Sequence, residues 1–342
     1  MQLSKPKTLV LGAGAWGTAL ALTLVRNGTS RVSLWGRDEN VMAEISAQRV
    51  NRKYLPGIVL PDELEITTGE NIAADVDVIV AATPFQTLRP VLKLILPQLS
   101  ELRCIVCAGK GIEKDTFLRA DQIVAELVPP DVEFAILSGP NFAVEVAEQR
   151  PAATTIATSS QQWGDELVRR FHSDAFRPYS SSDVIGVSIG GALKNVMAIA
   201  AGIADGLDLG ANSRAALVTR GLAEITRFGL AQGGKLETFM GLSGLGDLIL
   251  TCTDDKSRNR RFGLRLSAGL NAAQARQEIG LVEGVTTAAA VLEFSDQQHI
   301  DLPISREIAN TVCGRTTPRQ AVKNLLSRDP VAESAGLIAP HN

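Results

Sequence analysis

The sequence contains few of the residues that support metal or redox chemistry. Three histidines and four cysteines occur among 342 residues, and the histidines are scattered outside every motif described below. Cysteines this sparse do not form a disulfide framework. Cys104 and Cys107 form a C-x-x-C, but they lie in an apolar run that predicts a strand, where residues three apart point to opposite faces. We therefore interpret them as core cysteines and predict no metal site.

The sequence also lacks a large net charge and a long hydrophobic run. A net charge of −3 argues against general binding to nucleic acid or to a membrane surface, so any basic site must be local. Residues 1–7 are polar, unlike a signal peptide. The most apolar later stretch, residues 189–203, is too short and too polar to span a bilayer. We expect a cytoplasmic protein that inserts into no membrane and binds no nucleic acid.

The first half of the chain alternates short apolar runs with helical patterns. This alternation predicts βαβ units with a mostly parallel sheet. The predicted strands are residues 8–11, 32–35, 76–82, 104–108, 134–137 and 154–157, and the predicted helices include residues 17–27 and 117–127.

The pattern changes near residue 183. Beyond it, segments rich in Ala, Gly and Leu predict helices at residues 188–205, 213–232 and 271–279. We therefore predict an α/β domain over residues 1–183 and an all-α domain over residues 184–342. After residue 327 we expect loosely ordered chain.

Three glycines near the start of the chain have the spacing G-x-G-x-x-G. Gly12 permits a tight turn, Gly14 lets a pyrophosphate approach the backbone, and Gly17 allows close packing of helix on sheet. A strand is predicted before the pattern and a helix after it, and a helix N-terminus favours phosphates. The pattern predicts a Rossmann-like NAD(P)-binding domain, and the alternative is a structural glycine-rich turn.

The second predicted strand ends in Gly36, Arg37 and Asp38. NAD-specific domains usually carry an acidic residue at this point, for the ribose hydroxyl. Here arginine comes first, and its guanidinium suits a 2′-phosphate and can stack on adenine. NADP is therefore favoured, Asp38 keeps NAD open, and the alternative for Arg37 is a solvated surface charge.

Lys194 lies in a predicted helix that is otherwise built of small and apolar residues. Such a helix is expected to pack on most sides. Burial of a lysine is costly unless the lysine is paired, and burial lowers its pKa. A lysine that titrates near neutrality can deliver a proton to a carbonyl oxygen. The alternative is a side chain that extends to solvent.

Asp247 follows a segment that contains Gly241, Gly244 and Gly246. Glycines around one carboxylate suggest a backbone shaped for close approach. We expect Asp247 to hold either Lys194 or a substrate hydroxyl. The alternative is an aspartate that caps a helix at residues 248–252.

Residues 256–261 contain four cations in an otherwise acidic protein. Arg258 lies between Ser257 and Asn259, which add hydrogen-bond donors, and the cluster suits a phosphate on a small substrate. The alternative is an exposed basic turn that Asp254 and Asp255 balance.

Two further segments follow predicted strands. Lys110 comes after residues 104–108, and residues 138–143 come after residues 134–137. In open α/β sheets, ligands bind beyond the carboxyl ends of strands, so we expect both segments to line the binding crevice.

These segments together resemble one family, the NAD(P)-dependent glycerol-3-phosphate dehydrogenases of the bacterial type. The resemblance covers nearly the whole chain, from Gly12 to about Arg328. The matching motifs are G-A-G-A-W-G-T-A at 12–19, L-W-G-R at 34–37, K-G at 110–111, S-G-P-N-F-A at 138–143, G-G-A-L-K-N at 190–195, G-L-G-D at 244–247, T-C-T at 251–253 and S-R-N-R-R-F-G at 257–263.

The resemblance implies reversible reduction of dihydroxyacetone phosphate to sn-glycerol 3-phosphate, with a hydride from NADPH or NADH. It implies that Lys194 donates and accepts the proton, that Lys110 contacts cofactor and substrate, and that Asp247 acts with them. It also implies a homodimer that supplies the glycerol backbone for phospholipids. The implied substrate positions are Lys110, Gly139, Asn141, Lys194, Asn195, Asp247, Ser257, Arg258 and Asn259. The implied cofactor positions are Gly12, Gly14, Ala15, Trp16, Gly17, Arg37, Tyr54, Lys110, Ala143, Arg258, Leu281 and Glu283.

Two positions depart from the family pattern. Leu281 replaces a valine, and Asn141 stands where hydroxyl residues are common, with an amide expected to donate a hydrogen bond. Two other functions stay open. A dehydrogenase of 3-hydroxy acids or sugar acids would share the glycine fingerprint but would need no basic cluster. A dinucleotide sensor without catalysis would need no buried lysine.

Overall fold

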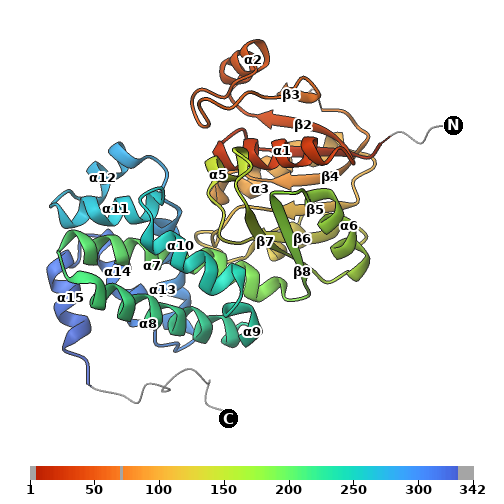
Figure 1. Ribbon diagram of the computed structural model, residues 1–342. Coiled ribbons are helices and arrows are strands. Elements are labelled where there is room, and N and C mark those ends of the chain that lie inside the picture. Colours follow the sequence, from red (N-terminus) through yellow and green to blue (C-terminus); the bar gives the residue numbers. More distant parts are fainter. Residues whose placement is uncertain (1–4, 70–71, 330–342) are drawn as a thin grey trace. The chain divides into compact units, whose positions relative to one another are not determined.

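The structure, a computed structural model, describes residues 5–69 and 72–329, which form two compact units (Figure 1). The first unit comprises the described chain up to Gly109 together with Ala120–Val184. The second comprises Lys110–Arg119 and the described chain from Ile185 onward. The predicted division at residues 183 and 184 stays a prediction for the functional domains. Residues 330–342, to which the expectation of loose order mainly applies, lie outside the described chain.

The first unit is built on one sheet. In the described chain this sheet has eight strands in the order β3-β2-β1-β4-β5-β6-β7-β8, and neighbouring strands are parallel except for the antiparallel pair β6 and β7. The chain order reverses at β1, and ligands bind beyond the carboxyl ends of strands at such a point. The strands are β1 Lys7–Leu11, β2 Arg31–Gly36, β3 Leu64–Thr68, β4 Val76–Ala81, β5 Cys104–Cys107, β6 Glu133–Ser138, β7 Ala152–Thr158 and β8 Phe176–Ser181.

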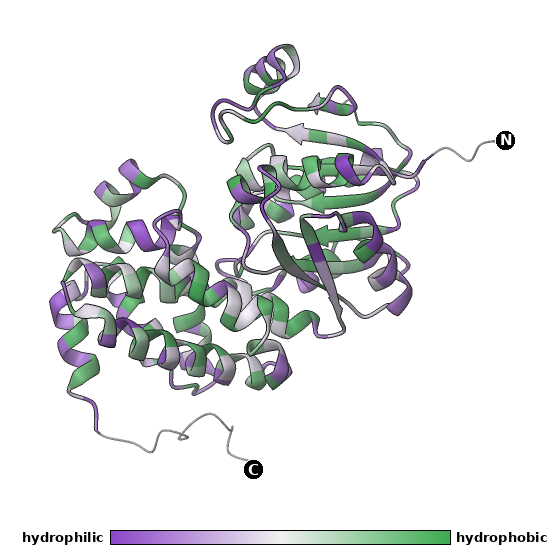
Figure 2. Cartoon of the chain, viewed as in Figure 1, coloured by the Kyte–Doolittle hydropathy of each residue, from purple (hydrophilic) through white to green (hydrophobic). Residues whose placement is uncertain are grey.

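The central strands carry the core of this unit. All residues of β1 and β5 are buried, and Figure 2 shows the middle of the sheet as hydrophobic. This burial explains why sequence patterns predict the central strands well. The two edge strands, β3 and β8, are absent from the prediction because each lies against one neighbour only and carries exposed polar residues.

The helices of the first unit include one that the sequence analysis placed wrongly. They are α1 Ala15–Asn27, α2 Glu39–Gln48, η1 Phe85–Thr87, α3 Leu88–Ile95, η2 Leu96–Gln98, α4 Ala120–Ala125, α5 Ala143–Ala147 and α6 Gln161–Phe171. The helix predicted at residues 117–127 begins instead at Ala120. Phe117 has a φ of 59°, which is incompatible with a right-handed helix, and its side chain packs in the second unit.

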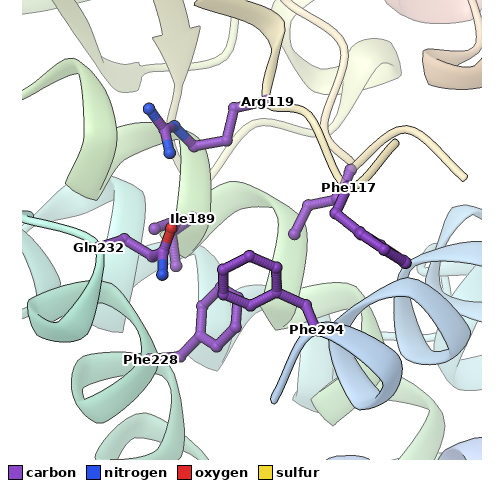
Figure 3. A pocket seen from close by; sticks show the side chains of 7 residues that line it. Phe117, Arg119, Ile189, Phe228, Gln232 and Phe294 are labelled. Atoms are coloured by element: carbon purple, nitrogen blue, oxygen red, sulfur yellow. The ribbon is translucent and has the colours of Figure 1, made fainter. Parts of the chain in front are cut away.

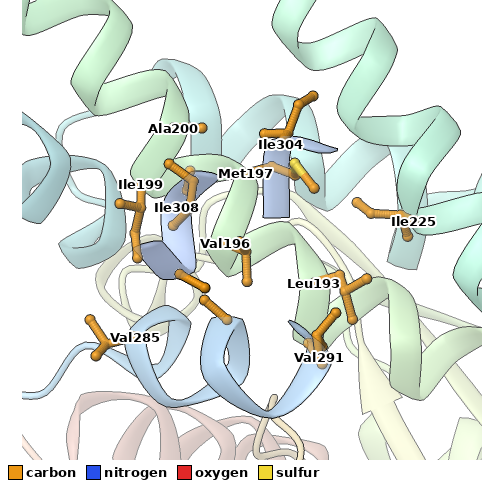
Figure 4. Close-up of a cluster of buried hydrophobic side chains, with 14 of the residues drawn as sticks. Leu193, Val196, Met197, Ile199, Ala200, Ile225, Val285, Val291, Ile304 and Ile308 are labelled. Carbon is orange, nitrogen blue, oxygen red and sulfur yellow. The ribbon is translucent and has the colours of Figure 1, made fainter. Parts of the chain in front are cut away.

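The second unit is helical, as predicted. Its elements are α7 Val184–Gly206, α8 Gly210–Ala231, α9 Leu236–Phe239, η3 Leu242–Gly246, α10 Asp247–Thr253, α11 Arg258–Ser267, α12 Ala272–Ile279, α13 Glu283–Gln297, α14 Pro303–Val312 and α15 Pro318–Leu326. The side chains of Leu193, Val196 and Met197 on α7 lie among residues of α8, α13 and α14 (Figure 4). The α/β unit followed by a helical unit confirms the predicted fold class.

Helix α7 packs unusually close to α11. A Cβ atom at Gly202 would overlap the carbonyl oxygen of Arg260, and a Cβ atom at Gly263 would overlap that of Ile199. The two backbones therefore touch, which brings the start of α11 beside the middle of α7.

Helix α7 is also, among the described residues, the one helix long and apolar enough to cross a membrane by length and composition. However, 89% of its most apolar window is buried inside the fold. Core helices of this kind satisfy the same criteria, so the finding is weak evidence for a membrane span.

Candidate active site

The glycine loop of the first unit has the geometry of a dinucleotide site. Gly12 has a φ of +108°, and a Cβ atom there would lie 2.9 Å from the carbonyl oxygen of Ala82. A Cβ atom at Gly17 would overlap the carbonyl oxygen of Gly12. Both positions therefore exclude any side chain, and they hold β1, the loop and α1 together.

Gly14 differs from the other two glycines because its free side faces open space. A Cβ atom there would have no described atom within 4 Å, and no described side chain caps α1. The first N–H groups of a helix lack intrahelical partners and favour anions. The indole Nε1 of Trp16, in the same turn, is buried without a hydrogen-bond partner in the described chain. These features fit the pyrophosphate of a dinucleotide.

The end of β2 separates the roles of Arg37 and Asp38. The carboxylate of Asp38 caps α2 by accepting a hydrogen bond from the backbone N–H of Val41, at 3.2 Å. Arg37 is exposed and makes no hydrogen bond or ion pair with any described residue. Tyr54 is 46% exposed, with the ammonium of Lys53 5.2 Å from its ring. The guanidinium of Arg37 is therefore available for a ligand, while one oxygen of the Asp38 carboxylate is engaged as a helix cap.

The turn after β6 carries Gly139, Asn141 and, at the start of α5, Ala143. Gly139 lies against β7, where a Cβ atom would be 2.8 Å from the Cα of Thr154. The amide of Asn141 donates to the carbonyl oxygens of Pro140 (3.0 Å) and Ala153 (2.9 Å). Asn141 thus donates hydrogen bonds, as expected, and both go to backbone carbonyl oxygens of the first unit. Its Oδ1 is buried without a partner in the described chain, so it offers an acceptor.

The second unit brings two lysines onto one carboxylate. The Nζ of Lys194 lies 2.6 Å from Oδ1 of Asp247, and the Nζ of Lys110 lies 2.6 Å from Oδ2. Asp247 is 1% exposed and Lys194 is 8% exposed. Two ammonium groups around one carboxylate leave a net positive charge, which suits an anionic substrate or a developing alkoxide.

Lys194 has a perturbed proton affinity. Burial, and to a smaller extent the charge of Lys110, lower the pKa of Lys194, while Asp247 raises it. The net result is a pKa of about 8 for Lys194, below the usual value. Its ammonium also donates to the hydroxyl of Thr251, at 2.8 Å. The third N–H has no partner among the described residues. A lysine that extends to solvent is therefore excluded, and this lysine is placed to donate a proton.

Thr251 is a residue that the sequence analysis missed. It belongs to the T-C-T motif, to which no role was assigned, and it lies one turn after Asp247 on α10. Residues four apart on a helix share a face, and this spacing was the available signal.

Local backbone geometry puts Asp247 in reach of Lys194. A turn of π-helix, η3, ends directly before Asp247. A Cβ atom at Gly190, one turn before Lys194, would lie 2.6 Å from the carbonyl oxygen of Ser243 in that turn. Helix α10 has no side-chain cap within the described chain, and Asp247 bonds to the lysines instead. The alternative of a capping aspartate is therefore excluded.

The basic cluster at residues 256–261 is only partly available for an anion. Lys256 pairs with Asp254 at 3.3 Å, and Arg260 pairs with Asp255 and, at 2.6 Å, with Asp205. The alternative of an exposed, balanced turn thus describes Lys256, whereas Arg260 is buried and pairs with two aspartates. Arg258 is exposed and makes no hydrogen bond or ion pair with a described residue. The anion site therefore narrows to the arginines at 258 and 261.

The neighbours of Arg258 have structural bonds of their own. Ser257 caps α11 by accepting from the backbone N–H of Arg260 at 3.2 Å. Asn259 donates to Oδ1 of Asn195 and accepts from the backbone N–H of Gly284, both at 2.9 Å. These bonds fix the start of α11 against α7 and α13.

Arg258 also lies in the electrostatic field of Glu283. The surrounding protein displaces water and lowers the pKa of Arg258, Arg261 lowers it too, and Glu283 opposes both. Glu283 begins α13, two residues after Leu281, which is 45% exposed.

The predicted positions thus fall into one set within each unit. The first unit carries Gly12, Gly14, Ala15, Trp16, Gly17, Arg37, Tyr54, Gly139, Asn141 and Ala143, and the second carries Lys110, Lys194, Asn195, Asp247, Ser257, Arg258, Asn259, Leu281 and Glu283. Among the described residues, no group of three or more His, Cys, Asp or Glu side chains could hold a metal ion. A doubly wound unit and a helical unit with a buried lysine are typical of dinucleotide-dependent dehydrogenases.

Comparison with known proteins specifies the family. Two family models match: the N-terminal domain of NAD-dependent glycerol-3-phosphate dehydrogenase over residues 7–164, and its C-terminal domain over residues 183–323. Glycerol-3-phosphate dehydrogenase [NAD(P)+] of Geobacter metallireducens is 46% identical, over 95% of this chain and 98% of that protein. The chain belongs to the NAD-dependent glycerol-3-phosphate dehydrogenase family, which confirms the resemblance seen in the sequence.

Solved structures agree with this assignment. The crystal structure of glycerol-3-phosphate dehydrogenase from Coxiella burnetii has a TM-score of 0.90 and 40% identity, covering 95% of this chain and 99% of that chain. The enzyme from Saccharomyces cerevisiae has a TM-score of 0.80 and 28% identity, covering 95% of this chain and 100% of that chain.

Proposed function

We propose that the protein reduces dihydroxyacetone phosphate to sn-glycerol 3-phosphate, reversibly, with NADPH or NADH. The observation that carries the proposal is the buried Lys194, paired with Asp247 and Thr251 and with one N–H unused in the described chain. A ketone that accepts a hydride becomes an alkoxide, and a positioned ammonium stabilises and protonates it.

The residues divide the work by unit. In the first unit, the turn around Gly14 and the N-terminus of α1 hold the pyrophosphate, and Arg37 holds a 2′-phosphate, which favours NADP over NAD. The bound dinucleotide supplies the hydride. We assign dinucleotide binding to residues 1–183 and substrate binding to residues 184–342, with Lys110 added to the second set.

In the second unit, Asp247 fixes the position of the Lys194 ammonium. The remaining N–H of that ammonium is then directed at the carbonyl oxygen of the substrate. Lys110 and Arg258 add positive charge for the substrate phosphate, and Asn195 and Asn259 hold the two helices that carry these groups. Holding the phosphate also positions the carbonyl carbon for attack.

The family further supports a homodimer in the cytoplasm that supplies the glycerol backbone of phospholipids. The dimer and the role in phospholipid supply rest on the resemblance, and the cytoplasmic location rests on the sequence composition. Light scattering of the purified protein tests the dimer directly, and a mass of one chain would reject it.

The proposal is tested by the loss of NADPH absorbance with dihydroxyacetone phosphate, run beside NADH. Unphosphorylated dihydroxyacetone and a 3-keto acid serve as controls. Turnover that depends on the phosphate supports the proposal. Preference for the keto acid would favour the rival dehydrogenase, and dinucleotide binding without turnover of any substrate would favour the sensor.

A further inference from the structure

The segment Lys110–Arg119 belongs to the second unit although the chain on both sides of it belongs to the first. Its first residue, Lys110, is bonded to Asp247. This ion pair fixes only the first residue of the segment. Other contacts must therefore hold the segment in the second unit and keep Lys110 bonded to the carboxylate of Asp247.

Two apolar side chains of the segment insert into the helical unit. Ile112 is 4% exposed and belongs to the core cluster of that unit. The ring of Phe117 meets the ring of Phe294 edge to face, with centroids 6.3 Å apart, and Phe294 in turn meets Phe228 at 5.7 Å. Figure 3 shows Phe117, Arg119 and Phe294 among the residues that line one small pocket.

Between these side chains the backbone forms a tight turn. The N–H of Glu113 donates to the carbonyl oxygen of Leu118 at 2.9 Å, and the N–H of Phe117 donates to that of Glu113 at 3.0 Å. Asp115 and Phe117 have φ angles of 72° and 59°. Left-handed backbone is unfavourable for a residue with a side chain, so tertiary contacts must maintain this turn.

We propose that Ile112 and Phe117 are positioning residues for the reaction, which anchor the segment in the helical core and so hold Lys110 on Asp247. The inference rests on the proposed function. Neither residue touches the reacting atoms. They act through Lys110, and through Lys110 on the proton donor Lys194.

This coupling can be measured through the pH at which reduction activity is lost, which general destabilisation of the fold does not change. The titratable groups that face Lys194 are Asp247, Lys110 and Cys252. The charge of Lys110 lowers the pKa of Lys194, so release of the segment raises the pH at which activity is lost. Loss of packing alone would lower the melting temperature and leave that pH unchanged.

The experiment compares Phe117→Ala with Ile308→Ala. Ile308 lies in α14 and belongs to the same core, where it is more deeply buried than Phe117. We expect Phe117→Ala to lower kcat roughly tenfold and to raise the pH midpoint by about 0.5 unit or more. Phe117→Leu should have a kcat and a pH midpoint close to those of the wild-type protein. Ile308→Ala should lower the melting temperature and leave the pH midpoint of activity unchanged. In a Lys110→Met background, adding Phe117→Ala should shift the midpoint no further.

A second readout needs no turnover. Labelling of the ligand-free protein with an amine-reactive ester, read by mass spectrometry, should modify Lys110 faster in Phe117→Ala than in Ile308→Ala. Equal labelling of Lys110 in both variants, or an unchanged pH midpoint in Phe117→Ala, would overturn the inference. A wild-type protein that does not reduce dihydroxyacetone phosphate would instead overturn the proposed function, and the labelling would still test the anchor.

Discussion

The glycine loop of the first unit and the lysine–aspartate cluster of the second use different groups to bind negative charge. The loop uses backbone N–H groups, and side chains must be absent at Gly12 and Gly17 for the backbone to close up. The cluster uses side chains, and Lys110, Lys194, Asp247 and Thr251 come from three separate segments of the second unit. One site depends on local sequence, and the other on the packing of the whole unit.

This difference predicts where each site is vulnerable. Removing one side chain from the cluster should lower turnover while the fold persists, because each group has a separate role. Adding one methyl to the loop should disturb either folding or cofactor binding, depending on which glycine receives it.

The largest expected effect is that of Lys194→Ala. Loss of the proton donor should lower kcat by at least ~100-fold, within the range for general acid–base catalysis. Binding of NADPH should be nearly unchanged, because the glycine loop lies in the other unit. Single-turnover kinetics and fluorescence titration measure the two effects separately. A variant with near-normal kcat would remove Lys194 from the mechanism.

Arg258→Ala should have the next largest effect. If Arg258 holds the substrate phosphate, kcat/KM should fall by roughly 2–4 kcal/mol, as for a lost charge-assisted contact. The loss should be much smaller with dihydroxyacetone, which lacks the phosphate. Because Arg258 is also implied in cofactor binding, the assay needs saturating NADPH. An equal proportional loss on both substrates would contradict the assignment.

Gly17→Ala and Gly14→Ala separate packing from binding within the loop. A methyl at Gly17 would overlap the Gly12 carbonyl oxygen, so Gly17→Ala should lose about 1–3 kcal/mol of unfolding free energy. A methyl at Gly14 meets no described atom within 4 Å, so Gly14→Ala should keep its stability and bind NADPH more weakly. Urea denaturation and cofactor titration measure both. The reverse pattern would mean that the open side of Gly14 does not face the dinucleotide.

Arg37→Ala should have a smaller effect, confined to one cofactor. Loss of a hydrogen-bonded charge should weaken NADPH binding by about 1.5 kcal/mol, the lower end of its range because Arg37 is exposed. NADH binding should hardly change. Equal losses for both cofactors would mean that Arg37 contacts a part of the dinucleotide common to both.

The same contrast, between local sequence and tertiary packing, explains which features of the fold and the site could be predicted from the sequence. The fold class and the central strands follow from local patterns, and so does the glycine loop, whose spacing is readable within residues 12–17 although Gly12 also packs against Ala82. The pairing of Lys110 with Asp247 is different, because it depends on Phe117 leaving the expected helix for a core formed far along the chain. The ion pairs of Arg260 likewise join α11 to Asp205, which no local pattern indicates.

The smallest expected effect, and the finest test of the cluster, is the dependence of activity on pH. The pKa of Lys194 is lowered from 10.5 to about 8, so the ammonium needed for ketone reduction is present below pH 8 and lost as pH rises through it. Between pH 7 and pH 8, kcat/KM for reduction should fall by only about half. Oxidation of glycerol 3-phosphate needs the neutral amine, and should rise over the same range.

Folding stability should respond with a defined sign. The unfolded chain keeps this proton up to about pH 10.5, so the cost of burying the Lys194 charge is present below pH 8 and is relieved as pH rises from about 8 to 10.5. Lys194→Met should remove this dependence, which urea denaturation at several pH values would show.

The pH profiles of kcat/KM should be recorded under conditions in which deuterated NADPH slows the reaction, so that the chemical step is observed. A reduction profile that stays flat from pH 7 to above pH 9 would mean that a group other than Lys194 supplies the proton.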